Sequence, residues 1–210
     1  KGDRDTDPPA IARGISWNAY GGYGMTAPWR SGLAQALAVS VMSEAHRMFN
    51  DPKYLEFADK LLAVFSVKVE NGGVLIRTNT GCWFEEYADE TGSNSRILNG
   101  HMQVLISMHD YHLYTGNVEA LRLYNEGLKA LIETLPAYDA GGYSYYDLKT
   151  HFATSQYHEM HHVQLNILYK KSGSPVLSWY AERWKKHIGV IYGNVYDYSR
   201  GVVAGARGFR

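Results

Sequence analysis

Two adjacent carboxylates stand inside an aromatic run at Trp83-Phe84-Glu85-Glu86-Tyr87. Aromatic neighbours and a second negative charge raise the pKa of a carboxyl group, by desolvation and by repulsion. A general acid or base requires a pKa of this kind. The run is therefore a candidate catalytic segment, and the alternative is an exposed acidic hairpin end.

A second aromatic run, Tyr143-Ser144-Tyr145-Tyr146-Asp147-Leu148-Lys149, alternates along its length. In a strand, Tyr143 and Tyr145 would share one face and Tyr146 would take the other. The pattern by itself favours a stacked aromatic hairpin. The chain has 17 tyrosines, and each offers a flat apolar face and a hydroxyl, which sugar-binding clefts use together.

A third cluster is Tyr157-His158-Glu159-Met160-His161-His162. His158, Glu159 and His162 match the H-E-x-x-H zinc pattern, which places two histidines on one face of a helix. No third ligand stands out in the sequence. The alternative is that these histidines form hydrogen bonds in the wall of a polar cleft.

The composition argues against several other classes of protein. Lys and Arg number 21 and balance 21 Asp and Glu, whereas nucleic-acid-binding domains usually show a basic excess. No apolar run approaches the roughly 18–20 residues of a membrane span. Gly21-Gly22-Tyr23-Gly24 follows no apolar strand, so it is not a dinucleotide-binding loop. Cys82 is the single cysteine, so the chain has no internal disulfide, and no targeting signal is recognisable.

These candidate residues alternate with helical segments that repeat. Residues 29–69, 95–135 and 155–188 each read as a helix, a short turn and a second helix. The turns use residues that end and start helices, namely Asn50-Asp51-Pro52, Thr115-Gly116-Asn117 and Ser172-Gly173-Ser174-Pro175.

The first helix of each segment is apolar along most of its length, whereas the second is apolar on one side only. An all-round apolar helix is predicted to be buried and a one-sided helix to face solvent. The first helices should therefore form an inner ring and the second helices an outer ring. The positions that indicate burial of the first helices include Leu33, Leu37 and Val41; Leu98, Val104, Leu105 and Met108; and Val163, Leu165 and Leu168.

Gly-rich aromatic stretches connect the segments, at residues 72–87, 141–152 and 193–202, and the first two suit short β-hairpins. Each of these two precedes an inner helix, so the connectors should gather at the N-termini of the inner helices. Those termini favour anions. The sequence predicts an all-α fold, an incomplete α/α toroid whose β-hairpin connectors lie at the active-site end. Its predicted limits are residues 28–189, after an N-terminal extension (1–27) and before a C-terminal tail (190–210).

Six motifs in this order resemble the C-terminal catalytic domain of the D-glucuronyl C5-epimerases, which act on heparosan and heparan sulfate. The resemblance implies an incomplete α/α toroid that follows β-rich domains. The matching motifs are PWRSGLAQALA (28–38), WFEEY (83–87), LNGHM (98–102), LPAYDAGGYSYYDLK (135–149), QYHEMHH (156–162) and SPVLSWYAERWKKH (174–187).

The resemblance also implies residue roles. Glu86 and Tyr157 fall on the family's catalytic acid/base positions, Tyr87 lies beside Glu86, and Tyr146 matches the tyrosine of the family's Y-D-L-R motif. Lys149 stands where the family has arginine; it keeps the charge but loses the bidentate fork. The family motif lacks Glu159, which argues against the zinc reading, and neither metal nor cofactor is expected. The implied substrate-binding residues are Trp29, Arg30, Gln35, Asn99, Lys149, His158 and His161.

The implied reaction is inversion of C5 of glucuronate in a polysaccharide, which gives iduronate. Removal of the C5 proton builds an enediolate, which Lys149, Arg30 and Tyr146 would stabilise. Three alternatives stay open: a uronate lyase that eliminates the C4 oxygen from the same carbanion, a polysaccharide-binding domain without chemistry, and a zinc hydrolase. The expected partner is a uronic-acid polysaccharide, not nucleic acid. The resemblance implies a secretory or extracytoplasmic location, and the open edge of the toroid favours a homodimer.

Overall fold

The computed structural model describes residues 12–13, 23, 25, 29–89, 95–188, 195–197 and 202–204. The chain forms two compact units, Lys1–Glu133 and Thr134–Arg210, and each is described by itself. The predicted N-terminal extension and C-terminal tail lie largely outside the described residues. Their limits therefore stay predictions.

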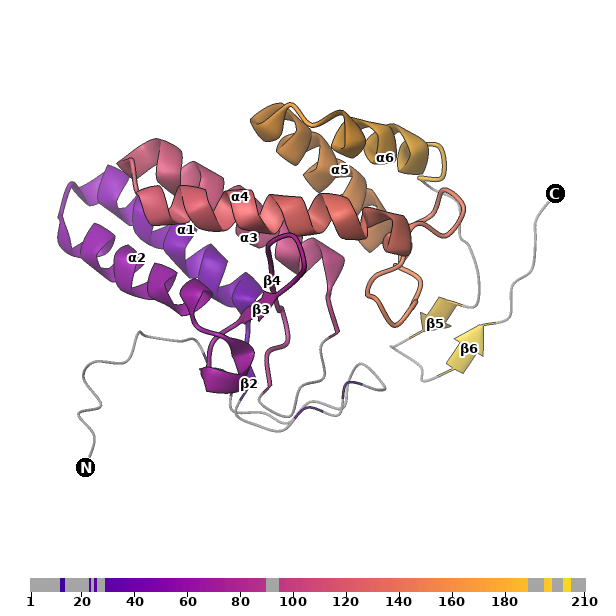
Figure 1. Ribbon diagram of the computed structural model, residues 1–210, viewed down its shortest axis with the longest axis horizontal. Coiled ribbons are helices and arrows are strands. Elements are labelled where there is room, and N and C mark those ends of the chain that lie inside the picture. The colour runs from indigo at the N-terminus through magenta and orange to yellow at the C-terminus, as the bar shows by residue number, and fades with distance from the viewer. Residues whose placement is uncertain are drawn as a thin grey trace. The chain divides into compact units, whose positions relative to one another are not determined.

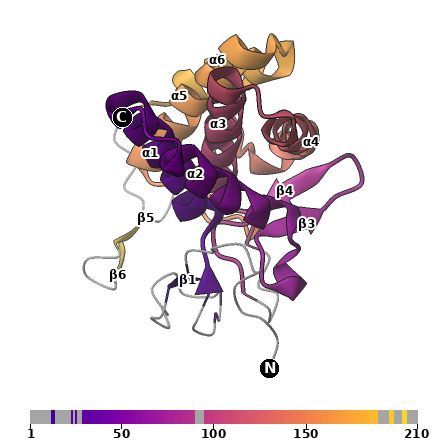
Figure 2. The ribbon, with the colours of Figure 1, turned by 90° about the vertical axis from the view of Figure 1, so that its left-hand side faces the viewer.

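The first unit contains two helical hairpins. The first is formed by α1 (Gly32–Phe49) and α2 (Lys53–Ala63), and the second by α3 (Leu98–Thr115) and α4 (Val118–Thr134). Helix α1 packs against both α2 and α3, and the four helices can be followed in Figures 1 and 2. Helix α3 buries ten of its residues, so it supplies the centre of this core.

Short elements join the two hairpins of the first unit. Two 3-10 turns, Val64–Ser66 and Val69–Asn71, lead into an antiparallel hairpin of β3 (Leu75–Arg77) and β4 (Cys82–Phe84). This confirms the β-hairpin that the first connector predicted. Near the N-terminus, β1 (Ala12–Arg13) pairs with β2 (Trp29–Arg30).

The second unit contains the third hairpin, formed by α5 (Ser155–Ser172) and α6 (Pro175–Lys185). A 3-10 turn, Leu135–Tyr138, precedes its connector. In that connector the predicted β-hairpin is reduced to two isolated antiparallel bridges, Asp139 to Ser144 and Tyr145 to Phe152. At the other end, β5 (Val195–Asp197) pairs with β6 (Val202–Ala204).

The first helix of each hairpin ends in the same way. Helices α1, α3 and α5 each have 18 residues and are followed by a left-handed residue: Asn50 (φ 50°), Gly116 (φ 74°) and Gly173 (φ 70°). The N–H of each donates to the carbonyl four residues earlier, at 2.7–2.8 Å. Glycine, and next to it asparagine, adopts this conformation with least strain. The turn residues thus end the helices where the sequence predicted.

The inner helices are less completely buried than the sequence predicted. Leu37 is 45% exposed and Val41 is 58% exposed on α1, and Val163 is 48% exposed on α5. Within its unit, α1 has α2 and α3 as neighbours, and neither covers the side that carries Leu37 and Val41. An apolar pattern shows that a side chain can be buried, whereas burial itself requires a neighbouring element.

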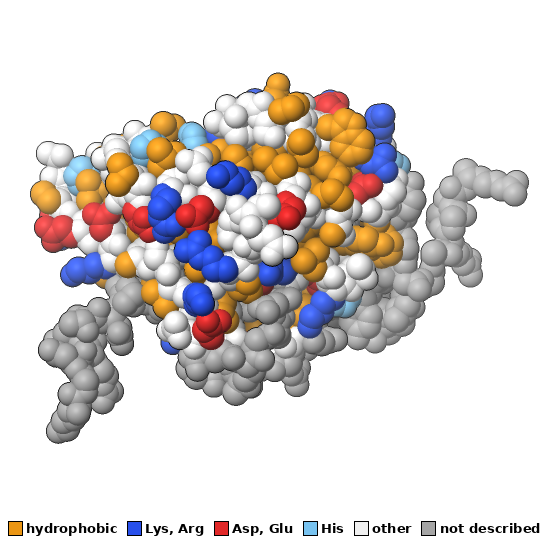
Figure 3. Space-filling view, in the orientation of Figure 1, with side chains coloured by type: hydrophobic (Ala, Val, Ile, Leu, Met, Phe, Trp, Pro, Cys, Tyr) orange, Lys and Arg blue, Asp and Glu red, His pale blue; other side chains and the backbone are white. Residues whose placement is uncertain are grey.

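Charged groups of the first unit form ion pairs within α4 and between α4 and β3. Arg122 on α4 pairs with Glu119 and Glu126, and Arg77 of β3 also reaches Glu126. On the face shown in Figure 3, basic and acidic side chains are interspersed, in keeping with the zero net charge. Such exposed pairs contribute little stability each.

The structure also bears on the single cysteine and on the membrane-span prediction. Cys82 is a free, buried thiol, and its burial, with the negative charge of Glu126, raises its pKa to about 12. The thiolate is therefore strongly disfavoured and the side chain is inert. None of the described helices is long and apolar enough to cross a membrane.

Candidate active site

The Trp83–Tyr87 segment lies beside the strand that leads into α1 and beside the first turn of α3. The Gly32 N–H donates to the Glu85 carbonyl at 2.9 Å, and the backbones of Arg30 and Ala88 exchange two hydrogen bonds of 2.8 Å. A Cβ on Gly32 would lie 2.5 Å from that carbonyl oxygen, so only glycine allows this approach. The segment therefore lies near helix N-termini, as the connector pattern predicted.

Glu86 lies against the first turn of α3. Its side chain is 6% exposed, and Asn99 Nδ2 donates to its Oε2 at 3.4 Å. A Cβ on Gly100 would lie 2.3 Å from the same Oε2 and 2.8 Å from the Glu86 Cβ. Glycine at position 100 thus makes room for the carboxylate at the positive end of the helix, which favours its negative charge. The structure brings the predicted residues Glu86 and Asn99 together.

Glu85 has a different environment from its neighbour. Its carboxylate is 1% exposed, accepts hydrogen bonds from the Arg96 N–H at 3.1 and 3.2 Å, and lies 3.5 Å from the Arg96 guanidinium. Ser95 Oγ donates to it at 3.3 Å. Burial raises the pKa of Glu85 to about 7 against the effect of Arg96, and the charge of Glu86 raises it further. The pair Glu85-Glu86 predicted one carboxyl with a raised pKa, and the structure shows it at Glu85. The Glu85 carboxylate is hydrogen-bonded to residues 95 and 96.

Aromatic rings close the region beside Glu86. Tyr87 meets Trp29 edge to face at 5.3 Å between ring centroids, and Tyr23 at 5.8 Å. Trp29 is 2% exposed and Tyr87 is 7% exposed. Both predicted residues therefore lie in one cluster, in which Trp29 offers little surface to a ligand.

Arg30 and Gln35, both predicted to bind substrate, lie at the start of α1. The Arg30 guanidinium approaches Gly72, where an added Cβ would lie 3.0 Å from Nη2. Gln35 is 1% exposed, and its Nε2 donates to the Leu61 carbonyl on α2 at 3.0 Å. Gln35 thus fastens α1 to α2.

Tyr146 and Tyr157 meet in the second unit. Their rings are 4.8 Å apart at an interplanar angle of 62°, and Tyr146 is 6% exposed. Tyr157 belongs to the first turn of α5, where its N–H donates to the capping Oγ1 of Thr154 at 3.4 Å. Tyr143 and Tyr145 both contact Phe152 instead, as the alternation predicted. The two candidate catalytic tyrosines are therefore in direct contact at the start of α5.

Two buried histidines lie behind these tyrosines. His158 Nδ1 accepts from the Ser144 N–H at 3.1 Å, while its Nε2 donates to the Trp184 carbonyl at 3.0 Å. Ser144 Oγ lies 2.9 Å from His158 Nδ1 and 2.8 Å from His161 Nδ1. Burial lowers the pKa of both imidazoles, that of His161 to about 3. The structure places the predicted residues His158 and His161 together as neutral, buried groups around Ser144.

Lys149 lies in the turn at residues 148–149, and residues 148–150 are exposed. Asp147 holds this turn by accepting from the His151 N–H at 3.1 Å and pairing with the His151 ring at 2.6 Å. The predicted cation is thus accessible, three residues beyond Tyr146.

The H-E-x-x-H residues do not form a set of metal donors. Both ring nitrogens of His158 are engaged in hydrogen bonds, and His162 Nδ1 bonds the Ala181 carbonyl at 2.8 Å. Among the described residues, no group of three or more His, Cys, Asp or Glu side chains could hold a metal ion. The donor set therefore does not fit zinc.

Sequence reasoning missed three contributors: His101, Ser144 and Arg96. His101 is fully buried, stacks on Trp83 at 3.8 Å and accepts from the Phe84 N–H at 3.1 Å. Burial lowers its pKa to about 3. A signal for His101 and His158 existed, because each is the fourth residue of an inner helix.

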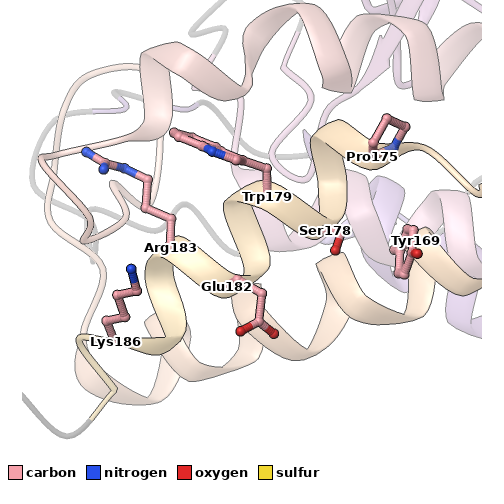
Figure 4. A pocket seen from close by; sticks show the side chains of 7 residues that line it. All are labelled: Tyr169, Pro175, Ser178, Trp179, Glu182, Arg183 and Lys186. Atoms are coloured by element: carbon pink, nitrogen blue, oxygen red, sulfur yellow. The ribbon is translucent and has the colours of Figure 1, made fainter.

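A surface groove on the second unit lies apart from these residues. Figure 4 shows its lining, which comes from α6 and the end of α5, and its volume is about 490 Å³. Arg183 in this lining is held by two hydrogen bonds from Nε and one from Nη2 to Asp139. None of the candidate catalytic residues lines it. The lining residues are Tyr169, Pro175, Ser178, Trp179, Glu182, Arg183 and Lys186.

Each unit thus offers groups that can move a proton at the start of an inner helix: a carboxylate, Glu86, in the first and paired phenols, Tyr146 and Tyr157, in the second. Neither arrangement includes an activated serine or a phosphate loop among the described residues. Proton transfer is the chemistry that these side chains support.

Comparison with known proteins shows the family of the chain. A family model described as D-glucuronyl C5-epimerase C-terminus matches residues 10–186. The D-glucuronyl C5-epimerase of Caenorhabditis elegans is 34% identical over 184 residues, which cover 79% of this chain and 29% of that protein. An uncharacterized protein of Methanocaldococcus jannaschii is 35% identical over 168 residues, covering 78% of this chain and 54% of that protein. The chain thus spans about half, or less, of the length of these relatives.

Among solved structures, cellobiose 2-epimerase from Spirochaeta thermophila has a TM-score of 0.56 and 18% identity, covering 77% of this chain and 43% of that chain. That enzyme is of the α/α toroid type, which confirms the predicted fold class. With a family model that matches residues 10–186, the chain belongs to the family of the D-glucuronyl C5-epimerase C-terminal domain.

Proposed function

We propose that this chain carries the catalytic residues of a carbohydrate epimerase that inverts C5 of D-glucuronate residues within a polysaccharide. The observation that carries the proposal is the placement of two chemically different proton-transfer groups at helix N-termini: Glu86 on the first turn of α3, and Tyr157 beside Tyr146 on the first turn of α5. The C. elegans relative is a D-glucuronyl C5-epimerase, which supports the choice of substrate.

In the proposed reaction Glu86 removes the C5 proton, and the electron pair of the C–H bond passes into the adjacent carboxylate as an enediolate. Tyr157 then donates a proton to C5 from the opposite face. A phenol with an ordinary pKa near 10 serves as an acid without help, whereas it needs nearby cations to serve as a base. After turnover, Glu86 holds a proton and Tyr157 lacks one, and exchange with solvent restores both groups.

The enediolate carries more negative charge than the uronate, so the site must supply positive charge and hydroxyl donors where this charge develops. Arg30, Lys149 and the Tyr146 hydroxyl are the proposed groups. Lys149 lies in an accessible turn. The partial positive charge at the N-termini of α3 and α5 also stabilises negative charge. The proposed scheme uses neither a metal ion nor an organic cofactor.

The test is NMR of a glucuronic-acid polymer of the heparosan type incubated with the chain in heavy water. We expect deuterium at C5 together with iduronate signals. Glu86→Gln and Tyr157→Phe should each lower the exchange rate by about 100-fold or more, the contribution of one general acid or base. Tyr145→Phe and Glu159→Gln are matched controls, because Tyr145 faces Phe152 and Glu159 is exposed. Both controls should retain exchange.

Two other outcomes would replace the proposal. Ultraviolet absorbance from an unsaturated uronate, without iduronate, would identify a lyase, in which the carbanion expels the C4 oxygen. Affinity for the polymer that survives both variants, with no deuterium incorporated by the unaltered chain, would identify a polysaccharide-binding domain.

A further inference from the structure

The fourth residue of every inner helix makes the same long-range hydrogen bond. Gln35, His101 and His158 hold this position on α1, α3 and α5. Each donates from a side-chain nitrogen to the backbone carbonyl 26 residues later on the outer helix of its hairpin, at 3.0, 3.1 and 3.0 Å. The accepting carbonyls are those of Leu61, Gly127 and Trp184. The three hairpins thus share this hydrogen bond between their helices as well as an inner helix of 18 residues.

In the second and third hairpins the residue is histidine, and its other nitrogen holds the connector. His101 Nδ1 accepts from the Phe84 N–H and His158 Nδ1 from the Ser144 N–H, both at 3.1 Å. A carbonyl can only accept, so in each ring Nε2 carries the proton and Nδ1 does not. Both imidazoles are therefore neutral and share one tautomer.

Each ring also stacks on the aromatic residue that precedes the bonded amide. His101 stacks on Trp83 at 3.8 Å and 12°, and His158 stacks on Tyr143 at 3.9 Å and 15°. The two contacts agree closely although the sequences around them differ. Each connector is thus held at two successive residues by one buried side chain.

The same register places the proposed catalytic groups. Glu86 lies two residues after the amide held by His101, and Tyr146 lies two residues after the amide held by His158. Each faces the third residue of its inner helix: Glu86 lies against Gly100, and Tyr146 against the Tyr157 ring. Glu86 and Tyr146 therefore occupy equivalent places in two copies of one arrangement.

We propose that His101 and His158 are positioning residues, which hold Glu86 and Tyr146 in catalytic register through a neutral, Nε2-protonated ring clamped between the connector amide and the outer helix. The inference rests on the proposed function. It assigns His158 an action through Tyr146 rather than the contact with substrate that the resemblance suggested. In the first hairpin, Gln35 occupies the equivalent position and makes the equivalent bond to the outer helix.

The first test is NMR of the 15N-labelled chain without substrate. We expect a coupling across the hydrogen bond between the Ser144 amide nitrogen and His158 Nδ1, and another between the Phe84 amide nitrogen and His101 Nδ1. Both rings should show the Nε2–H form from pH 5 to 8, and adding the glucuronic-acid polymer should leave it unchanged. This readout does not depend on activity, so it remains informative if the proposed function fails.

The second test compares glutamine with alanine at positions 101 and 158. Glutamine accepts through Oε1 and donates through Nε2, as Gln35 shows for the donor half, so His158→Gln and His101→Gln should retain most of the C5 exchange rate. Alanine leaves the buried connector amide without its acceptor and removes the link between the inner helix and the outer helix. His158→Ala and His101→Ala should lower kcat by about 100-fold, the effect of displacing a catalytic group by about 1 Å, with little change in KM.

His112→Gln on α3 is the matched control, because His112 also bonds a carbonyl, that of Asn117, but lies at the far end of the helix. It should leave kcat and KM unchanged. The inference is overturned if His158→Gln is as inactive as His158→Ala with a raised KM, or if the His158 ring titrates near neutral pH and shifts with polymer. Should the alanine variants not fold, the glutamine variants and the NMR of the unaltered chain still decide.

Discussion

At the scale of residues, Glu85 and Glu86 show how neighbours of one type come to lie in different environments. Glu86 lies at the start of α3 with Asn99 and Gly100, whereas Glu85 is buried against Arg96 and Ser95. Side-chain type cannot distinguish them. The difference comes from which face of the segment meets which helix.

The buried carboxyl of Glu85 predicts a pH effect on stability. Its folded pKa of about 7 lies above the ordinary 4.5, so its contribution to stability is complete below pH 4.5 and is lost as the pH rises to 7. The full difference corresponds to about 3 kcal/mol. In Glu85→Gln this titration is absent, so urea unfolding from pH 4.5 to 8 should show the stability of the unaltered chain falling relative to the variant. A difference that is constant over this range would contradict the account of Glu85; the buried histidines titrate alike in both proteins and cancel.

Gly100 predicts an effect on activity and on stability. In Gly100→Ala the new Cβ displaces the Glu86 carboxylate, and a misplacement of about 1 Å lowers catalysis by about 100-fold. The Glu86 Cβ must also shift, because it lies 2.8 Å from the new Cβ, so thermal unfolding should occur at a lower temperature. Kinetics of C5 exchange and calorimetry measure the two effects, and Leu113→Ala, an exposed site on α3, is the control. Normal exchange in Gly100→Ala would show that Glu86 needs no such placement.

At the scale of elements, one helical hairpin is repeated with the same devices. Each inner helix has 18 residues, ends on a left-handed residue and uses its fourth side chain to hold the outer helix. The connectors differ in sequence, and they place different side chains at the inner helices: Glu86 in the first unit and Tyr146 in the second. The helix-ending residue and the fourth residue of the inner helix thus recur in every hairpin. The connector determines which side chain lies at the start of the inner helix.

The left-handed helix ends allow a direct test of this repeat. Nothing lies within 4 Å of a Cβ built on Gly173, so Gly173→Ala adds backbone strain alone and should destabilise the chain by about 1–2 kcal/mol. Asn50→Gly at the equivalent position of the first hairpin removes strain and should be neutral or stabilising. Chemical denaturation compares the two variants. Equal losses in both would show that these residues do more than end their helices.

At the scale of the whole molecule, the inner helix α1 carries apolar side chains that its own unit does not cover. Leu37 and Val41, one turn apart, are 45% and 58% exposed. Apolar groups that gather on a surface mark a place where another element or chain packs. The relatives are longer than this chain, so a further segment or a second copy can meet this side.

For the chain as it stands we predict a homodimer that uses this side of α1. Sedimentation velocity at micromolar concentration should show the dimer, and Leu37→Glu with Val41→Glu should shift it to monomer without loss of helical circular dichroism. Leu113→Glu, which changes an exposed apolar residue on α3, should leave the dimer intact. A monomeric mass for the unaltered chain would refute the prediction.

Much of this protein could be predicted from its sequence because the signals are local. The ends of α1, α3 and α5 follow from Asn50, Gly116 and Gly173, whose backbone preferences act within one turn. The opposite faces of Tyr145 and Tyr146 follow from the strand period in the same way. The motifs also indicated Glu86, Tyr146 and Tyr157 as the residues of interest.

Only the tertiary structure decided what the remaining polar residues do. Gln35 and His158 are compatible, as residue types, with binding a sugar, yet they bond carbonyls 26 residues away. The exposure of Leu37 depends on which helices flank α1, and the raised pKa of Glu85 depends on its burial beside Arg96. Burial and hydrogen-bond partners depend on segments that are distant in the sequence and that the fold brings together. A local pattern therefore shows which interactions a side chain can make, and the tertiary structure determines which of them it does make.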